Sequence, residues 1–315
     1  MFIPPEGVYF RLVGRESGYK IYSRDDDPEP HLWHYGGPPY EDQLFSLIHG
    51  TGKRAGLYAI KGKVSGKVIF SRTAQTPYVG HIGGDGHYND NWFKFVAGPS
   101  TGNHANHFRI WCPASGVAIF SRTTQKPEVG NYGPVANDQY FSFQFDNDAN
   151  GLVVERIDFD VSQGKILGEV TMILGTQTVT NTSQNQTKEP TFSFSETAPA
   201  SSNFEYRSGF PLDAGWVLKT GIPAVSNGVI MIDSTVNDRK FGTPDNNTKT
   251  YTASFKGKVG PGNKAIATLS VQRAMLEVPY TIHLKSKSGV RTETMGLWSG
   301  MSTWGLKHDV REEQI

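Results

Sequence analysis

The sequence predicts an all-β protein with two domains, and three observations carry that prediction. Gly accounts for 35 of the 315 residues, and 18 Phe and 13 Tyr accompany abundant Thr, Ser and Val, a composition that favours strands and turns over helices. The first half of the chain repeats one pattern of short strands. The second half holds long stretches in which apolar and polar residues alternate, as they do in amphipathic strands. A chain of this length is long enough for two domains.

Residues 1–148 contain three copies of one pattern, at about 1–50, 51–100 and 101–148. A Ser-Arg pair recurs in every copy, and a closing phenylalanine falls at Phe45, Phe93 and Phe141, 48 residues apart both times (93 − 45 and 141 − 93). Each copy offers about four short strands, too few to bury a core alone. Three copies packed about a pseudo-threefold axis can close one core, which predicts a β-trefoil with these phenylalanines inside. A solenoid or propeller is the structural alternative, although propellers need four or more blades.

The second copy contains the groups that a sugar site needs. Sugars are held by planar hydrogen-bonding groups and by an aromatic ring against the apolar side of the pyranose. Arg72 can donate, Asp90 can accept and Tyr88 can stack, while the Val79-Gly80 pair leaves backbone groups accessible. The candidate sugar contacts of this copy are Arg72, Val79, Gly80, His81, Tyr88, Asp90 and Asn91.

The other two copies keep less of this pattern. In the third copy Ala136 replaces the stacking tyrosine, although Tyr132 or Tyr140 could supply a ring. In the first copy Leu32-Trp33 replaces the Val-Gly pair, and the indole would fill the site. The candidate sugar contacts of the third copy are Arg122, Val129, Gly130, Asn131, Asp138 and Gln139. We expect the second site to bind best, the third to follow and the first to have lost binding; alternatively, the recurring Arg, Asp and Gln side chains only tie turns together.

Residues 149–315 are predicted to form a second domain of long antiparallel strands, because alternating Thr-, Ser- and Val-rich stretches follow the repeats. Within 191–219 the even positions are mostly apolar and the odd positions mostly polar. This period is typical of a transmembrane β-hairpin with one face to lipid and one to a lumen. We predict a membrane-inserting hairpin within about 192–218, with its turn at 198–203 or 209–213. Its apolar residues are Phe192, Phe194, Phe204, Tyr206, Phe210, Leu212, Trp216 and Leu218.

One hairpin cannot cross lipid alone, because its outer backbone groups would stay unpaired. Each spanning strand needs roughly 9–11 residues, and the stretch 192–218 is long enough for two strands and a turn. Several chains would have to join their hairpins in one closed barrel, so insertion implies a homo-oligomeric ring. The alternative is a hairpin that stays packed on its own sheet, in which case the second domain only assembles a non-lytic oligomeric lectin.

Two sets of motifs give the chain a family resemblance. The endings Gln43-Leu-Phe45, Asn91-Trp-Phe93 and Gln139-Tyr-Phe141 resemble the Gln-x-Trp signature of ricin-type lectin trefoils, with Phe in place of Trp. The segments NGVIMIDSTVNDRKFG, TKTYTASFKGKVGPGNKAIATLSVQ and VPYTIHL, in this order, resemble an aerolysin-like pore-forming module. The combination, over residues 2–315, resembles the haemolytic pore-forming lectins typified by that of the sulphur-shelf bracket fungus.

This resemblance implies an N-terminal β-trefoil followed by an elongated, aerolysin-like antiparallel β module. It implies that the second and third repeats bind galactose-type sugars, such as lactose or N-acetyllactosamine, on glycoproteins or glycolipids. It also implies that the protein forms ring oligomers on membranes that display those glycans and lyses them, as a haemolysin or cytolysin does.

Other functional classes find little support in the sequence. The 31 basic and 30 acidic residues leave a net charge of +1, which gives no electrostatic reason to expect nucleic acid as a partner. The single cysteine, Cys112, allows no intramolecular disulfide. The pairs His31/His34 and His104/His107 lie in loop-like sequence without an obvious third ligand, so we expect no metal and no cofactor.

The sequence also lacks the usual signs of catalysis and of a membrane helix. It has no phosphate loop or nucleophile motif, and no spacing pairs its carboxylates, so we predict no catalytic residue. An enzyme with a sugar-binding appendage is the remaining alternative. The N-terminus lacks the pattern of a secretory signal, and no run of about 18 apolar residues occurs. We therefore expect a soluble protein, cytoplasmic or exported without a leader, that acts at a target-cell membrane.

Overall fold

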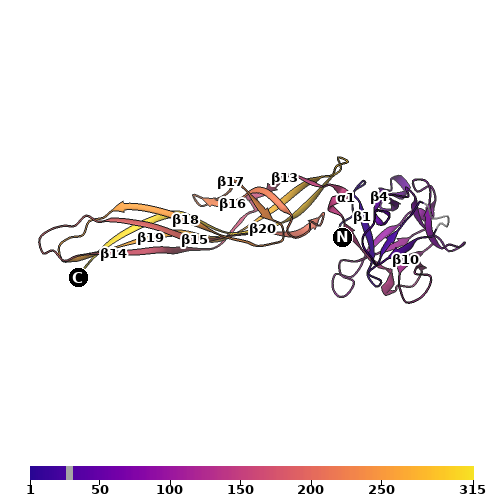
Figure 1. The fold of residues 1–315 in the computed structure, drawn as a ribbon, viewed down its shortest axis with the longest axis horizontal. Coiled ribbons are helices and arrows are strands. Elements are labelled where there is room, and N and C mark those ends of the chain that lie inside the picture. Colours follow the sequence, from indigo (N-terminus) through magenta and orange to yellow (C-terminus); the bar gives the residue numbers. More distant parts are fainter. Residues whose placement is uncertain (26–30) are drawn as a thin grey trace. The chain divides into compact units, whose positions relative to one another are not determined.

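The computed structural model describes residues 1–25 and 31–315, and strands dominate its regular structure (Figure 1). The prediction of an all-β fold is confirmed. Residues 26–30, which belong to the first repeat, lie outside the described residues. The chain divides into two compact units, Met1–Val153 with Lys285–Thr292, and Val154–Leu284 with Glu293–Ile315. The sequence pattern did not indicate that the late segment Lys285–Thr292 would join the first unit.

The first unit contains twelve strands of one connected sheet, four from each repeat. The strands are β1 (Phe10–Gly14), β2 (Lys20–Tyr22), β3 (Trp33–Tyr35), β4 (Phe45–His49), β5 (Tyr58–Gly62), β6 (Val68–Ser71), β7 (Val79–Ile82), β8 (Lys94–Ala97), β9 (Phe108–Cys112), β10 (Val117–Ser121), β11 (Val129–Tyr132) and β12 (Tyr140–Phe145). The helical turns are η1 (Glu41–Gln43), η2 (Gly52–Arg54), η3 (Asn89–Asn91), η4 (Asn137–Gln139) and α1 (Asn147–Asn150).

Strand pairing in the first unit is that of a β-trefoil. Strand β1 pairs with β12 and β4, β4 pairs with β5, and β9 pairs with β8 and β12. A bridge between Tyr58 and Phe93 joins the beginning of β5 to the residue before β8 and closes the ring. The remaining strands form the hairpins β2–β3, β6–β7 and β10–β11, one from each repeat. A six-stranded barrel with three hairpins is the architecture that the threefold repeat predicted.

The closing phenylalanines of the repeats form the centre of the trefoil core. Phe45, Phe93 and Phe141 are fully buried and belong to one apolar cluster together with Phe10 and Phe108. Burial of such a side chain contributes about 1.5–3 kcal/mol to folding. The assignment of these residues to the core is confirmed, and each repeat supplies one of them, so no repeat can close the core without the other two.

Hydrogen bonds also link each repeat to its neighbour. In every copy the buried serine of the Ser-Arg pair bonds to the residue at one equivalent position in another copy. The pairs are Ser23 with His81 (2.6 Å), Ser71 with Asn131 (2.9 Å) and Ser121 with His34 (2.7 Å). Repeat two therefore bonds to repeat one, repeat three to repeat two, and repeat one to repeat three. This closed cycle explains why the serine recurs in all three copies, whether or not a copy has kept the residues for a sugar site.

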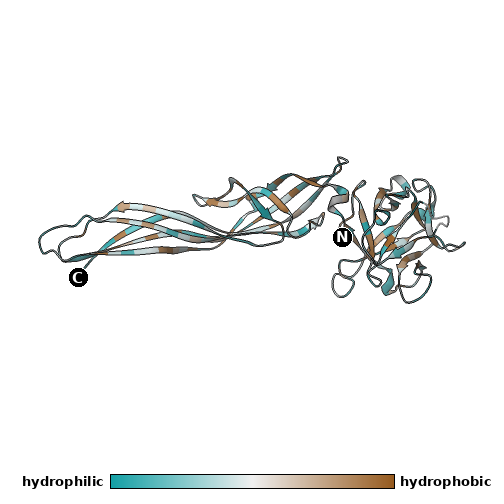
Figure 2. Cartoon of the chain, in the orientation of Figure 1, coloured by the Kyte–Doolittle hydropathy of each residue, from teal (hydrophilic) through white to brown (hydrophobic). Residues whose placement is uncertain are grey.

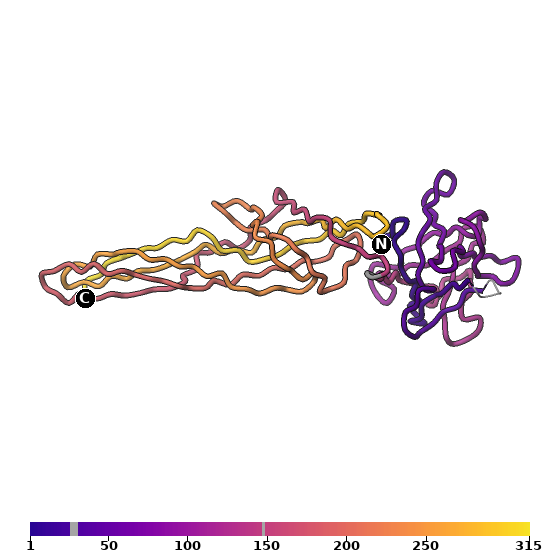
Figure 3. The backbone as a smooth tube through the Cα atoms, turned by 45° about the horizontal axis from the view of Figure 1, so that its top comes forward, coloured from indigo at the N-terminus to yellow at the C-terminus, as the bar shows by residue number. Residues whose placement is uncertain are grey.

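The second unit is built from long antiparallel strands. Figure 3 shows them as extended segments that run side by side. They are β13 (Val153–Phe159), β14 (Lys165–Asn181), β15 (Thr191–Gly209), β16 (Val217–Ser226), β17 (Val229–Lys240), β18 (Asp245–Lys256), β19 (Asn263–Lys285) and β20 (Arg291–Gln314), with the turn η5 (Val161–Gln163). The order β13-β19-β20-β15-β18 forms the main sheet, and β14 pairs with β19. Hydrophobic residues alternate with hydrophilic ones along these strands (Figure 2), as predicted for amphipathic strands.

The segment 192–218 does not form a hairpin in this structure. Strand β15 is continuous through 198–203, where a turn was one expectation, and it pairs with β18 over Thr191–Ser202 and with β20 over Ser201–Gly209. The chain leaves the strand only at Gly209, whose φ of 87° is one that residues with a Cβ rarely adopt. Because the alternation continues along the whole strand, β15 can pair with both β18 and β20. A turn within 198–203 would break the hydrogen bonds to both partner strands.

Strands β16 and β17 form a hairpin that follows most of the predicted stretch. Among the described residues they pair with each other alone, in a separate two-stranded sheet. Asn227 and Gly228 make the turn with φ values of 51° and 78°, which is the backbone of a tight Asn-Gly hairpin. Of the eight predicted apolar residues, Leu218 lies in β16, Trp216 immediately precedes this strand, and the other six come earlier in the chain.

Candidate functional site

In each repeat the predicted aspartate sits in a short 3₁₀ turn, and the residue after it holds that turn together. The buried side chains of Gln43, Asn91 and Gln139 each accept a hydrogen bond from the backbone N–H three residues earlier, at 3.1, 3.1 and 3.3 Å. Asn91 Nδ2 also donates to the carbonyl of Ile69 at 3.3 Å. Gln139 Nε2 donates to the carbonyl of Tyr132 at 2.9 Å. We therefore assign Asn91 and Gln139 to the fold instead of the predicted sugar contacts.

The arginines of the second and third repeats are also fixed by the protein. The guanidinium carbon of Arg72 lies 4.3 Å from the ring centre of Phe70, and that of Arg122 lies 4.1 Å from the ring centre of Phe120. Arg72 Nε donates to the carbonyl of Pro77 at 3.1 Å, and Arg122 Nε makes the equivalent bond to Pro127 at 3.3 Å. The two guanidinium groups are thus pre-positioned, and their terminal nitrogens remain as donors.

The carboxylates differ between the first repeat and the other two. In the first repeat Arg24 Nε donates to Asp42 Oδ2 at 2.7 Å, while Asp42 Oδ1 is buried without a hydrogen-bond partner among the described residues. In the third repeat the shortest approach of Arg122 to Asp138 is 3.7 Å. Burial raises the pKa of Asp90 and of Asp138, although the nearby Arg72 or Arg122 opposes this shift. A partly desolvated carboxylate that is incompletely paired is a strong acceptor for sugar hydroxyls.

The Val-Gly pair contributes its backbone more than its side chains. Val79 and Val129 are buried in the trefoil core. A Cβ on Gly130 would lie 2.6 Å from the ring of Phe120, so only glycine lets this ring lie against the strand. Trp33 occupies the equivalent position of the first repeat, as the pairing of β2 with β3 confirms. The histidine that follows Gly80, His81, is buried and bonded to Ser23, so we assign it to the fold.

A cavity of about 840 Å³ lies at the third repeat. Its walls include five of the six contacts predicted for this repeat, namely Arg122, Val129, Gly130, Asn131 and Asp138. Tyr132 lines it with 54% of its surface exposed, whereas Tyr140 is buried and stacks on His104 at 3.9 Å. Of the two tyrosines that could replace the missing ring, the structure places Tyr132 in the cavity.

The second repeat brings its predicted stacking residue to the surface. Tyr88 immediately precedes η3, is 58% exposed, and lies two residues before Asp90. Asn131 lines the third-repeat cavity, but its Nδ2 is bonded to groups of the second repeat. Sequence reasoning missed two features, the phenylalanines under the arginines and the presence of second-repeat residues in the third-repeat cavity. The sequence Phe-Ser-Arg, which occurs in the second and third repeats, was the available signal for the phenylalanines under the arginines.

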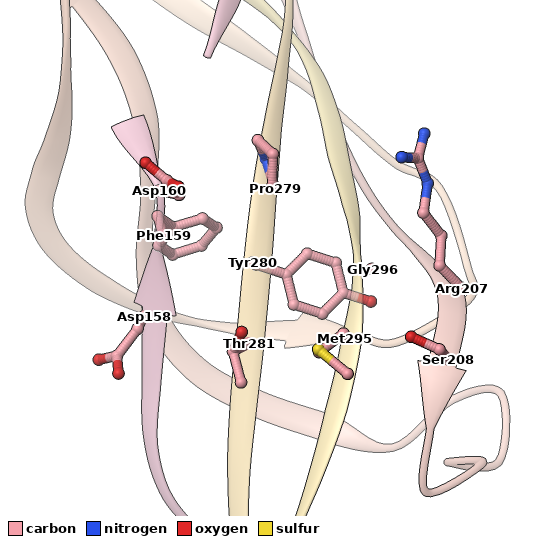
Figure 4. A pocket seen from close by; sticks show the side chains of 10 residues that line it. All are labelled: Asp158, Phe159, Asp160, Arg207, Ser208, Pro279, Tyr280, Thr281, Met295 and Gly296. Carbon is pink, nitrogen blue, oxygen red and sulfur yellow. The ribbon is translucent and has the colours of Figure 1, made fainter. Parts of the chain in front are cut away.

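A second hollow, of about 550 Å³, lies on the main sheet of the second unit (Figure 4). Figure 4 shows the ring of Tyr280 near its centre, with Asp160 on one side and Arg207 on the other. Arg207 lies at a register shift between β15 and β20, where a bulge redirects its side chain. The Tyr280 hydroxyl donates to the carbonyl of Glu205 at 3.0 Å, and burial raises the pKa of Tyr280.

The carboxylates of this hollow are already engaged. Asp158 accepts from Arg156 Nε and from His283 Nε2, both at 2.9 Å. Asp160 accepts from the hydroxyl of Ser162 at 2.5 Å and caps η5. Among the described residues that line the hollow, these two aspartates are the carboxylic acids, and both serve the fold. The hollow therefore does not provide the free acid and base that glycoside hydrolysis needs.

The remaining candidates can be placed briefly. His34 is buried against Ser121, and His104 lies between Tyr140 and Asn137, so these histidines serve the trefoil. Within residues 1–25 and 31–315, no group of three or more His, Cys, Asp or Glu side chains could hold a metal ion. In the same residues no helix has the length and apolarity to cross a membrane.

Comparison with known proteins bears on the first unit. No protein-family model matches the sequence, and no curated protein matches it. A solved structure described as BEL beta-trefoil is 54% identical, over 46% of this chain and 97% of that chain, with a TM-score of 0.43. This chain is thus similar in sequence to that β-trefoil over nearly half of its length. The prediction of a β-trefoil is confirmed.

More distant structures also resemble this chain. The lamprey immune protein is 15% identical over 98% of this chain and 96% of its own, with a TM-score of 0.42. Parasporin-2 from Bacillus thuringiensis, a toxin that recognises cancer cells, is 13% identical over 62% of this chain and 86% of its own, with a TM-score of 0.34. An aerolysin-like protein from Bombina maxima is 12% identical over 51% of this chain and 98% of its own, with a TM-score of 0.35. No residue role is taken from them.

Proposed function

We propose that this protein is a lectin for galactose-type glycans that assembles on glycan-bearing membranes and opens a pore of pooled β-hairpins. The observation that carries the lectin part is the difference between the repeats. The first repeat closes its aspartate with an arginine at 2.7 Å, whereas the second and third leave Asp90 and Asp138 partly desolvated beside a fixed arginine. A partly desolvated carboxylate beside a positioned arginine can accept hydroxyl hydrogens from a ligand through charge-assisted hydrogen bonds.

The proposed sugar contacts follow from this geometry. In the second repeat Asp90 accepts hydroxyl hydrogens, the terminal nitrogens of Arg72 donate to hydroxyl oxygens, and Tyr88 covers the apolar face of the pyranose. The backbone of Val79-Gly80 borders the sugar, since no side chain at Gly80 blocks it. In the third repeat, Asp138, Arg122, the Val129-Gly130 backbone and Tyr132 take the same roles. Galactose, lactose and N-acetyllactosamine are the sugars with which to begin, because of the family resemblance.

The proposed pore segment is the hairpin β16–β17, in preference to the sequence-predicted stretch 192–218. Its strands of 10 and 12 residues match the roughly 9–11 residues that span a bilayer. Among the described residues it pairs with no other strand, so its release would break few backbone bonds, whereas extraction of β15 would break ladders on both sides. The half next to its turn is apolar, with Val225 and Ile230 on one face and Ala224 and Met231 on the other.

Lysis of red cells tests the whole proposal. The full-length protein should release haemoglobin, and free lactose should block this release. It should also leak dye from vesicles that carry a lactose-bearing glycolipid, but not from vesicles without it. A protein that binds lactose and never leaks dye would instead be a non-lytic oligomeric lectin, the competing function. A protein that binds none of these sugars would remove the lectin part.

Two engineered disulfides separate the two candidate pore segments. Ser193 and Ser254 face each other across β15 and β18 with 3.3 Å between their hydroxyls, so cysteines there would lock the stretch 192–218. The backbone N–H of Val225 donates to the Ser302 hydroxyl at 3.2 Å, so these two residues are neighbours. Cysteines at both positions would tether the hairpin β16–β17. We expect the 225–302 disulfide to stop lysis until it is reduced and the 193–254 disulfide to leave it intact. The reverse result would restore the stretch 192–218 as the inserting segment.

A further inference from the structure

The cavity at the third repeat is not built by that repeat alone. Its lining includes the segment Thr76–Val79 of the second repeat and His31 of the first. Tyr78 is 48% exposed and lies in this wall, away from the aspartate turn of its own repeat. The third site therefore has two exposed rings, Tyr132 from its own repeat and Tyr78 from the neighbouring one.

Asn131 holds the second-repeat segment of this cavity wall in place. Its Nδ2 donates to the Ser71 hydroxyl at 2.9 Å, to the Arg72 carbonyl at 2.9 Å and to the Tyr78 carbonyl at 3.2 Å. One side chain thus ties the strand that carries Val129-Gly130 to both ends of the second-repeat loop. Because three acceptors share one amide, the loop can shift little relative to the third site, and the position of Tyr78 belongs to the third site's geometry.

The size and chemistry of the cavity suit more than one sugar ring. A volume of about 840 Å³ lies near the upper end of the range for small-molecule sites, roughly 300–1,000 Å³. Arg122 and Asp138 provide the charged groups for one pyranose. Thr76 and Gln125 also line the cavity and supply a hydroxyl and an amide, which are the groups that further sugar hydroxyls need.

The second tyrosine is particular to this site. The residue before the Val-Gly pair is Tyr78 in the second repeat, Glu128 in the third and His31 in the first. By the cyclic order of the Ser–His/Asn bonds, the second site borders the first repeat, where this position is His31. The first site borders the third repeat, where it is Glu128. Among the described residues, the third site alone has a tyrosine at this position of its neighbouring repeat.

We propose that the third site is a composite of two repeats and takes a linear glycan of two or more linked sugars, with Tyr78 as the platform for a sugar beyond the one that Asp138 holds. This rests on the proposed sugar-binding function. It makes the two active repeats unequal: the second recognises a terminal sugar, and the third recognises a longer chain. The lack of an aromatic ring at Ala136 then matters less, because the rings of Tyr132 and Tyr78 stack on the sugars instead.

The test is calorimetric titration of the full-length chain with galactose, lactose and a tetrasaccharide of two N-acetyllactosamine units. An Asp90→Ala background isolates the third site, and Tyr78→Ala, Tyr78→Phe and Tyr88→Ala are added to it. We expect Tyr78→Ala to weaken the tetrasaccharide about three- to tenfold and galactose hardly at all. Tyr78→Phe should retain the affinity, because the ring face is kept, and Tyr88→Ala, the matched control at the other site, should change nothing.

Each outcome decides the proposal. Equal affinities of the third site for galactose and the tetrasaccharide would overturn it, as would a Tyr78→Ala variant that binds the tetrasaccharide normally. Binding by the wild type that disappears entirely with Asp90→Ala would mean that the third site is not a site. In these cases the lectin function survives. If the wild type binds none of the three sugars, the proposed function itself fails. An unchanged melting temperature for Tyr78→Ala rules out misfolding as the cause of a loss.

Discussion

Replacement of Asp90 by Asn should separate the stability of the trefoil from its sugar affinity. Burial is the main cause of the raised pKa of Asp90, and the charge of Arg72 opposes it only in part. A carboxyl group whose pKa rises on folding favours the folded state below its unfolded pKa, about 3.9, and loses that contribution as the pH rises through the folded pKa. At neutral pH the ionised Asp90 therefore costs the apo protein some stability, and Asp90→Asn removes that cost.

Sugar binding should respond in the opposite direction. The ionised carboxylate accepts sugar hydroxyls, and hydrogen bonds to a charged group contribute about 1.5–3 kcal/mol each. Loss of one such bond corresponds to about a 10- to 150-fold increase in the Kd for lactose. Wild-type affinity should also fall as the pH is lowered through the raised pKa of Asp90, because protonation removes the acceptor. The affinity of Asp90→Asn should show a smaller pH dependence, since only the third site still titrates.

Thermal unfolding and calorimetric titration with lactose, each from pH 4 to 8, measure both effects. Asp42→Asn is the matched control, because Asp42 occupies the equivalent turn but is bonded to Arg24 at 2.7 Å. This control should lose stability and keep lactose affinity. An Asp90→Asn protein that binds lactose as tightly as the wild type at pH 7, or that melts markedly earlier, would refute the reasoning that burial primes this carboxylate for a ligand.

Three further predictions follow from the same structure. Asp90→Ala should reduce lactose binding more than Asp138→Ala, because Tyr88 stands beside the first of them; equal losses in titration calorimetry would contradict this ranking. Gly130→Ala should lower the free energy of unfolding by about 1–3 kcal/mol, as measured by denaturant titration, because the new Cβ would lie 2.6 Å from a phenylalanine ring. The hydrogen bond from Arg156 lowers the pKa of Asp158, so its small stabilising effect is present above about pH 4 and is lost as the pH falls further. A melting-temperature difference between wild type and Asp158→Ala that persists at pH 2 would contradict it.

The fold was predictable from the sequence where period and repetition determine it. Three phenylalanines at equal spacing indicated one shared core, and all three are buried there. The two-residue alternation identified long strands, but it could not identify their partners. Pairing depends on residues far apart in sequence, which is why 192–218 was interpreted as a hairpin although β15 lies between β18 and β20. The Asn227-Gly228 turn was the better local signal, because positive φ at two successive positions strongly favours a tight hairpin.

The candidate sites were predictable only as a list of residue types. The charge of Arg72 acts on Asp90, and Tyr88 is exposed beside the same turn. Asn91 and Gln139, which have equally suitable chemistry, are buried and hold their turns, and the buried His81 bonds to Ser23. Sequence alone does not distinguish an amide that binds a ligand from one that binds a backbone carbonyl, because both need the same donor and acceptor. The sequence could not predict that Tyr78 lines the third-repeat cavity, for a different reason. This placement depends on which two repeats pack against each other in the fold.

Under the proposed function, the first repeat is a copy that has lost its ligand and kept its fold. The serine, glutamine and phenylalanine of its pattern cannot change freely, because Ser23 bonds to His81, Gln43 holds η1 and Phe45 fills the core. The aspartate is different: without a sugar it is a partly buried charge that must find another partner. Arg24 supplies that partner at 2.7 Å. The arginine–aspartate separation therefore differs between the repeats, at 2.7 Å in the first and 3.7 Å in the third, and this difference is the geometric basis of the proposal that only the later repeats bind sugar.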